Sequence, residues 1–87
     1  MPNILHDAND RVSVGAALDY GDVRTNWNRT AAGWSEILGV KVTAEKALLC
    51  MIWVKVCREV HKAKRDNLVD IAGYARCLEI VGEHQEP

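Results

Sequence analysis

A long apolar run in the middle of the chain is its strongest pattern. Between Ala47 and Cys57 every residue is apolar except Lys55. A surface helix usually has one apolar stripe and one polar face. Because this segment is apolar on nearly all sides, we expect a helix over residues 44–62 or 63, capped by Thr43, that several neighbours cover. A second copy of the chain would complete that cover, so a homo-oligomer is expected.

The segment before this run predicts an amphipathic helix. Asp22 is suited to cap its start, and Gly39 is a natural stop after Leu38. Its apolar stripe recurs at helical spacing and consists of Val23, Trp27, Ala31, Trp34 and Leu38, widened by Ala32 and Ile37.

The segment after the run predicts a third strong helix. It follows a tight connection at Lys64 and Arg65, takes Asp66 as its cap and ends near Gly82. Gly73 lies in its interior at a cost of about 1 kcal/mol relative to Ala, which close approach of another helix or a ligand would explain. The residues expected to face the core are Ile71, Ala72, Ala75, Leu78 and Ile80 or Gly82. A second stripe holds Asn67, Asp70, Tyr74, Cys77 and Val81.

The remaining segments are short. Residues 3–14 predict a weaker, fraying helix, residues 15–21 a connection with Gly at both ends, and residues 84–87 a disordered tail. No alternation typical of a strand persists, and short connections favour antiparallel neighbours. The prediction is therefore a single all-α domain over residues 1–87: a small antiparallel bundle of three strong helices plus a weaker N-terminal helix.

Charge and cysteine content narrow the classes of function. The formal net charge is −1, which argues against a general nucleic-acid binder. Three cysteines, two of them in the apolar run, argue against a disulfide framework and are typical of small core residues in a reducing cytosol. No signal peptide or membrane span is visible. We expect a cytoplasmic protein with no membrane partner.

Basic residues nonetheless gather in residues 55–65, where Glu59 is the single acid. Such a cluster suits an anionic ligand or partner. It is equally typical of a solvated helix end, where cations complement the helix dipole. The three tryptophans have two interpretations as well: they fill a small core, or one of them stacks on a base.

The most interesting candidate residues lie on two helices that the short connection brings together. Cations from the central helix would face an acid and a phenol from the last helix. This arrangement could hold a phosphate or could be a buried ion pair that fixes the hairpin. The candidate ligand-binding residues are Lys55, Arg58, Lys62, Asn67, Asp70 and Tyr74.

A metal site and a catalytic centre have less support. Asp66 and Asp70 are four residues apart and could share a helix face. Two carboxylates without a histidine would hold Mg²⁺ only if phosphates of a ligand completed the site. No pairing of a nucleophile with a base is readable, so we predict no catalytic residue.

Residues 19–79 resemble a family of small phage and prophage proteins of unassigned function. The similarity rests on Asp19-Tyr20-Gly21, on Asn26-Trp27 with Arg29, on Trp34 with Leu38-Gly39-Val40, on Met51 to Arg58, and on the run from Arg65 to Ala75. The resemblance implies a phage or prophage origin and action inside a host cell.

More distantly, the pattern resembles the all-α nucleoside triphosphate pyrophosphohydrolases of the MazG type. Those enzymes bind magnesium through two carboxylate motifs on neighbouring helices. Here one motif would fall on Lys55 to Arg58, with bases in place of both acids, and the other on Asn67 to Asp70. Only Asp70 matches a metal ligand of those enzymes. This departure from the motifs leaves open a site that binds phosphates directly, with at most vestigial hydrolysis. We therefore expect a protein that binds a nucleotide or another phosphorylated ligand. The alternative is a phage accessory protein of the anti-defence type that inhibits a host protein.

Overall fold

The computed structural model describes residues 2–15 and 22–82, and this part of the chain is helical without strands. The N-terminal segment forms α1 (Ile4–Asp10) and continues as one π-helical stretch, η1 (Arg11–Gly15). The other helices are α3 (Val23–Leu38), α4 (Ala44–His61) and α5 (Arg65–Val81). The predicted all-α class, with three strong helices and a weaker first one, is confirmed. The predicted connection and tail fall almost wholly outside the described residues.

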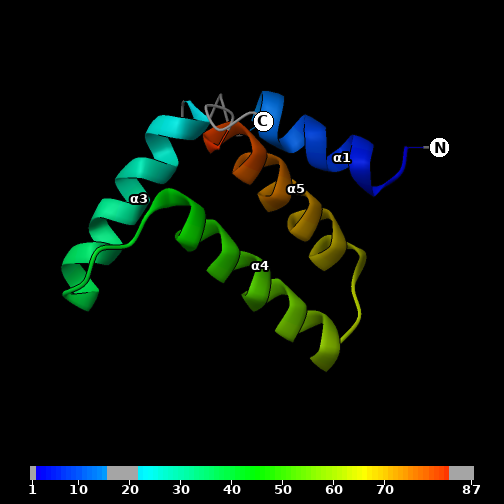
Figure 1. The fold of residues 1–87 in the computed structure, drawn as a ribbon. Helices are drawn as coiled ribbons and strands as arrows, with labels where there is room; N and C mark the ends of the chain where they lie inside the picture. The colour runs from blue at the N-terminus through cyan, green and yellow to red at the C-terminus, as the bar shows by residue number, and fades with distance from the viewer. Residues whose placement is uncertain (1, 16–21, 83–87) are drawn as a thin grey trace.

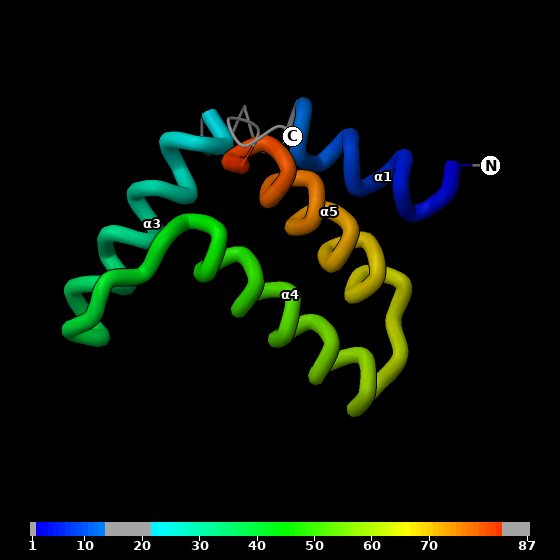
Figure 2. Tube along the Cα trace, in the orientation of Figure 1, coloured from blue at the N-terminus to red at the C-terminus, as the bar shows by residue number. Residues whose placement is uncertain are grey.

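The long helices α4 and α5 lie side by side and run in opposite directions (Figure 1). The first helix, α1, lies along α5 (Figures 1 and 2). Helix α3 packs against α4 and α5 at the end that lies away from the linker between them. Helix α3 lies oblique to α4 (Figure 1). The predicted arrangement as an antiparallel bundle of all the helices therefore stays a prediction. The three-residue linker between α4 and α5 holds the two helices in a hairpin, and this hairpin positions the candidate site.

The core is small and lies where α3, α4 and α5 meet the N-terminal segment. Leu48 and Val69 are the only large side chains that are almost fully buried among the described residues. Trp27 and Tyr74 pack edge to face with ring centroids 5.9 Å apart. The buried cluster consists of Val12, Ala31, Ala44, Ala47, Leu48, Cys77 and Val81. The second predicted stripe of α5 is thus buried more deeply than the first, in which Ala75 is exposed.

Three of the predicted helix boundaries are confirmed. The side chain of Asp22 accepts a hydrogen bond from the Thr25 amide at 3.0 Å, and that of Thr43 accepts one from the Lys46 amide at 3.2 Å. Both act as N-caps. Gly39 ends α3 with φ of 73°, a left-handed conformation that favours glycine.

The predicted cap of α5 was wrong. Lys64 occupies the N-cap position, and Asp66 lies inside the first turn. No side chain at the N-cap position bonds to the helix. The carboxylate of Glu59, on α4, instead accepts a hydrogen bond from the Lys64 amide at 2.9 Å. An acid from the neighbouring helix therefore satisfies the N-cap amide, as the N3 acid of a capping box would, and a local capping rule cannot detect it.

The other helices cover one side of α4 only, and the predicted cover of the opposite side by a second copy stays a prediction. The other helices bury Ala44, Ala47 and Leu48 but leave the opposite side open. The main neighbours of α4 are α3 and α5, because α1 packs on α5 instead. We call the uncovered side the α4 apolar face; it consists of Leu49, Cys50, Trp53, Val54, Cys57 and Val60.

Several residues expected in the core are correspondingly exposed. Cys50 and Cys57 are not core residues, and only Cys77 is buried. Ile37 and Leu38, predicted on the apolar stripe of α3, are also exposed, because the end of α3 points away from α5 (Figure 1). No described helix has both the length and the apolar character needed to cross a bilayer.

Candidate functional site

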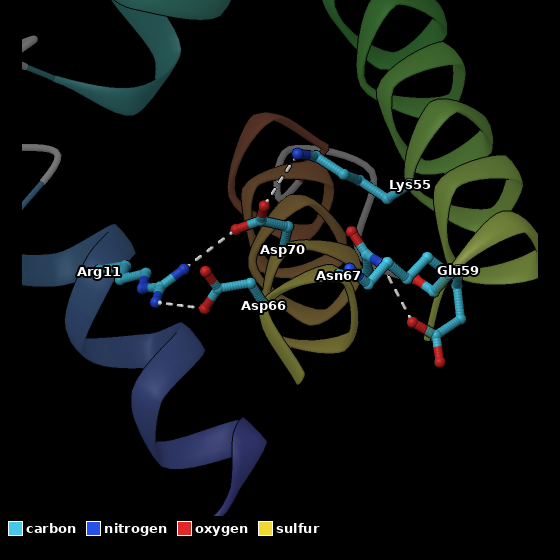
Figure 3. Close-up of polar contacts among 7 residues, drawn as sticks. Arg11, Lys55, Glu59, Asp66, Asn67 and Asp70 are labelled. Carbon is cyan, nitrogen blue, oxygen red and sulfur yellow. Dashed lines mark hydrogen bonds and ion pairs between the residues drawn. The ribbon is translucent and has the colours of Figure 1, made fainter. Parts of the chain in front are cut away.

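Lys55 and Asp70 form an ion pair between the two helices of the hairpin. Lys55 Nζ lies 3.0 Å from Asp70 Oδ2, and Figure 3 shows the ammonium directed at the carboxylate. The Lys55 side chain is only 13% exposed, so its apolar stem packs between the helices while its charged end meets the acid. Of the two roles the sequence left open for Lys55, the geometry favours the pair that fixes the hairpin.

Arg11, from η1, extends this pair into a chain of alternating charges. Its Nη1 donates to Asp70 Oδ1 at 3.1 Å and its Nη2 to Asp66 Oδ1 at 3.3 Å. Figure 3 shows the guanidinium reaching the two carboxylates of α5 from the side opposite Lys55. Asp70 is therefore held by cations from two directions. Arg65 adds a further link to the N-terminal helix, with its Nη2 2.7 Å from Asp7 Oδ2.

Asn67 is buried at the start of α5 and is held by α4. Its amide donates to Glu59 Oε1 at 3.1 Å and to the Lys62 carbonyl at 3.3 Å (Figure 3). The Lys64 amide and then the Asn67 side chain, both bonded to the carboxylate, lower the pKa of Glu59 below its ordinary value of 4.5. Asn67 thus fixes the hairpin turn.

A groove of about 690 Å³ lies between the C-terminal half of α4 and the N-terminal half of α5. Five of the six predicted ligand-binding residues line it. Tyr74 does not: it packs on Trp27, and burial raises the pKa of its phenol. The lining residues are Trp53, Val54, Lys55, Cys57, Arg58, His61, Lys62, Lys64, Asp66, Asn67 and Asp70.

The groove carries excess positive charge. Its two acids, Asp66 and Asp70, already pair with Arg11 and Lys55. Among the described residues, no carboxylate lies within ion-pair distance of the other basic side chains that line it. Those side chains are Arg58, His61, Lys62 and Lys64. A concave surface lined by uncompensated cations attracts anions.

The residues present do not fit a magnesium ion well. Asp70 has one oxygen bonded to Arg11 and the other to Lys55, and Asp66 is bonded to Arg11 as well. A cation would have to displace these partners. Within residues 2–15 and 22–82 there is also no group of three or more His, Cys, Asp or Glu side chains arranged to hold a metal. Asp66 and Asp70 thus act as ion-pair partners of Arg11 and Lys55 in this structure.

Sequence comparison gives the class of protein. Residues 3–82 match the family model described as "Domain of unknown function (DUF6378)". Over 79 residues the chain is 38% identical to the Gene 55 protein of Mycobacterium phage L5, covering 88% of this chain and 51% of that protein. The chain therefore belongs to the DUF6378 family, and it spans about half the length of this phage relative.

These matches confirm the predicted relation to small phage proteins. They do not address the distant resemblance to MazG-type hydrolases, which stays a prediction. No solved structure matches the chain.

The sequence indicated most residues that line the groove, but not Arg11 and Glu59, which hold its walls in place. The basic cluster and the facing stripe of α5 indicated most of its lining. Arg11 was missed because it is 59 residues from Asp70 along the chain, and no local pattern reports such a contact. Glu59 was visible only as the single acid in a basic segment. An acid isolated among cations next to a helix start is the one signal that could have indicated its role.

Proposed function

We propose that this protein binds a phosphorylated small molecule, with nucleotides as the preferred class, in the groove between α4 and α5. The observation that carries the proposal is the charge imbalance of the groove. Its acids are neutralised by Lys55 and Arg11, whereas the cations on the other wall have no acidic partner among the described residues.

Arg58, Lys62 and Lys64 are the proposed phosphate ligands. A guanidinium offers paired donors that match two phosphate oxygens, and lysine ammonium groups add point charges beside it. The three residues come from the end of α4 and the turn that follows, so they can gather around one anion.

Trp53 supports a ligand with a planar base. It lines the groove, and its side chain is 67% exposed. Exposure of a large apolar ring is unfavourable in water, and stacking on a base would offset it by about 1–3 kcal/mol. The proposed pose has the base on Trp53 and the phosphates toward Arg58 and Lys64.

In this proposal Lys55 and Asp70 shape the groove and do not contact the phosphate. The Lys55 ammonium is committed to Asp70 at 3.0 Å, and breaking that pair would leave a partly buried charge without a partner. Asn67 has a similar supporting role through Glu59. We propose binding without catalysis, because a pyrophosphohydrolase would need Asp66 and Asp70 freed from Arg11 and Lys55 to hold magnesium.

The test is a titration of the full chain with ATP and with inorganic pyrophosphate, each with and without magnesium, followed by calorimetry. We expect both ligands to bind, and binding to weaken as salt rises. Arg58→Ala should weaken binding about tenfold, equivalent to roughly 1.4 kcal/mol. Arg29→Ala is the matched control, because Arg29 is an exposed cation of α3 outside the groove. Absence of binding at low salt, or equal loss in both variants, would contradict the proposal.

A second candidate function is inhibition of a host protein. The observation that favours it is the α4 apolar face, which is continuous with the basic cluster through Trp53 and Cys57. In this alternative the partner would cover the face and its acidic groups would meet the cations. Leu49→Glu should then abolish inhibition of that partner while Arg29→Ala leaves it unchanged.

A further inference from the structure

We infer that the α4 apolar face is covered by the same face of a second copy, with the two α4 helices antiparallel. The face is extensive for so small a chain: Leu49 is 55% exposed, Trp53 67% and Val60 84%. Contiguous exposed apolar surface on a small domain usually marks an interface. Trp53 and Cys57 line the groove as well, so a base stacked on Trp53 would compete with this contact, whereas a phosphate held by Arg58 and Lys64 would not.

The small core is the first argument for a constitutive partner. The largest side chains that are almost fully buried in the described part of the chain are Leu48 and Val69, and none of the three tryptophans is buried. Chains of this size have little core to offset the entropy of folding and commonly depend on association. A partner needed for stability must be present wherever the chain is made, and a second copy always meets that condition.

The spacing of the face is the second argument. Cys50, Trp53, Cys57 and Val60 follow one another at intervals of three, four and three residues, the spacing of inward positions in a two-helix coiled coil. In an antiparallel pair, Cys50 would lie opposite Val60 of the second copy, and Trp53 opposite Cys57 of the second copy. Each large side chain would then face a smaller one, as close packing requires.

Charge selects the antiparallel orientation. The C-terminal end of α4 is basic, with Arg58 and His61 in the last turn, whereas Glu45 lies in the first turn. A parallel pair would bring the two basic ends together. An antiparallel pair keeps the two basic ends apart, and it opposes the helix dipoles favourably. Lys46 is exposed in the first turn of α4, and its flexible stem lets the ammonium reach solvent at the rim.

The face extends along α4 from Leu49 to Val60. A standard stable interface buries about 800 Å² per partner, so polar residues that border the face would join the apolar residues in the contact. Trp53 and Cys57 belong to both this interface and the groove, so the mutations that test the dimer are at Leu49 and Val60, which do not line the groove.

Light scattering on the full chain gives the first test. We expect twice the single-chain mass of 9.7 kDa, held over a wide range of concentration. Leu49→Glu should shift the mass to that of one chain, while Ile37→Glu, at an even more exposed apolar residue of α3, should leave the dimer intact. A wild-type chain that stays monomeric, or a dimer that survives Leu49→Glu, overturns the inference. The first of these outcomes would leave the face free for a different protein.

Cross-linking gives the orientation even if Leu49→Glu does not fold. In an antiparallel dimer Val60→Cys places a new thiol opposite Cys50 of the second copy, so mild oxidation should join the chains through these two positions. The wild-type chain should not cross-link efficiently. If oxidation instead links Cys50 to Cys50 or Cys57 to Cys57 in the wild type, the helices are parallel and the antiparallel dimer is wrong.

Discussion

Lys55 Nζ lies 3.0 Å from Asp70 Oδ2, across the contact between α4 and α5. This pair fixes the register of the hairpin, and it accounts for the charged residue inside the longest apolar run of the chain. Because Arg11 bonds to the other oxygen of Asp70, the same carboxylate also anchors the N-terminal segment. One acid therefore connects three helical segments.

Asp70→Asn should destabilise the fold. The substitution keeps the shape of the side chain but removes the charge that Lys55 and Arg11 share. Leaving a partly buried ammonium without its partner should lower the free energy of unfolding by about 1–3 kcal/mol. Urea denaturation followed by circular dichroism measures this change. Asp10→Asn, at an exposed acid paired with His6 within α1, should cost less than 1 kcal/mol; an equal cost would contradict the structural role of Asp70.

The Lys55–Asp70 contact was predictable from sequence because the linker is short. With few residues between two helices, the neighbours of each position follow from helical geometry. The role of Arg11 was not predictable, since its contact with Asp70 depends on how a separate helix docks. From the sequence, Lys55 and Asp70 could be either a ligand-binding site or a structural ion pair. The structure favours the structural ion pair, because the ammonium bonds to the acid and is not directed into the groove.

The exposure of the α4 apolar face could not be predicted either. An apolar pattern reports that a surface avoids water, but it does not report which chain covers it. Leu48 and Leu49 are adjacent in sequence, yet Leu48 is buried and Leu49 is exposed. Local preference treats the two leucines alike. The number and length of the neighbouring helices decide between them.

Glu59→Gln should remove part of the acid sensitivity of the fold. The pKa of Glu59 is lowered in the folded chain from its ordinary value of 4.5. A lowered carboxylate pKa means that the ionised form stabilises the fold above about pH 4.5 and that this stabilisation is lost as the pH falls through the folded value. We expect the wild type to lose more stability than Glu59→Gln between pH 6 and pH 3, measured by thermal melts.

The control for this prediction is Glu36→Gln, at an exposed acid of α3. Its pH profile should follow that of the wild type. Identical profiles for wild type and Glu59→Gln would show that the bonds from Lys64 and Asn67 do not stabilise the charged form of Glu59.

Gly73→Ala should stabilise the protein. A methyl group built at Gly73 meets only Val12 Cγ2, at 3.8 Å, which is an ordinary van der Waals contact. Alanine in a helix interior is favoured over glycine by about 0.5–1 kcal/mol, so the melting temperature should rise. Gly39→Ala should do the opposite, because φ of 73° at that position strains any residue with a Cβ. If Gly73→Ala instead destabilises, η1 packs on α5 more tightly than this contact indicates.

Cys77 should be the slowest of the three thiols to react. It is buried, and burial raises the pKa of its thiol, so little of the reactive thiolate forms at neutral pH. Cys50 and Cys57 are exposed on α4 in the single chain. In the Leu49→Glu variant, a colorimetric disulfide reagent should label two thiols quickly and the third only when urea opens the core. In the wild type, a dimer through α4 should slow Cys50 and Cys57 as well, and dilution below the dissociation constant should restore their rate. Three equally fast thiols in the folded variant would contradict the burial of Cys77 between α5 and its neighbours.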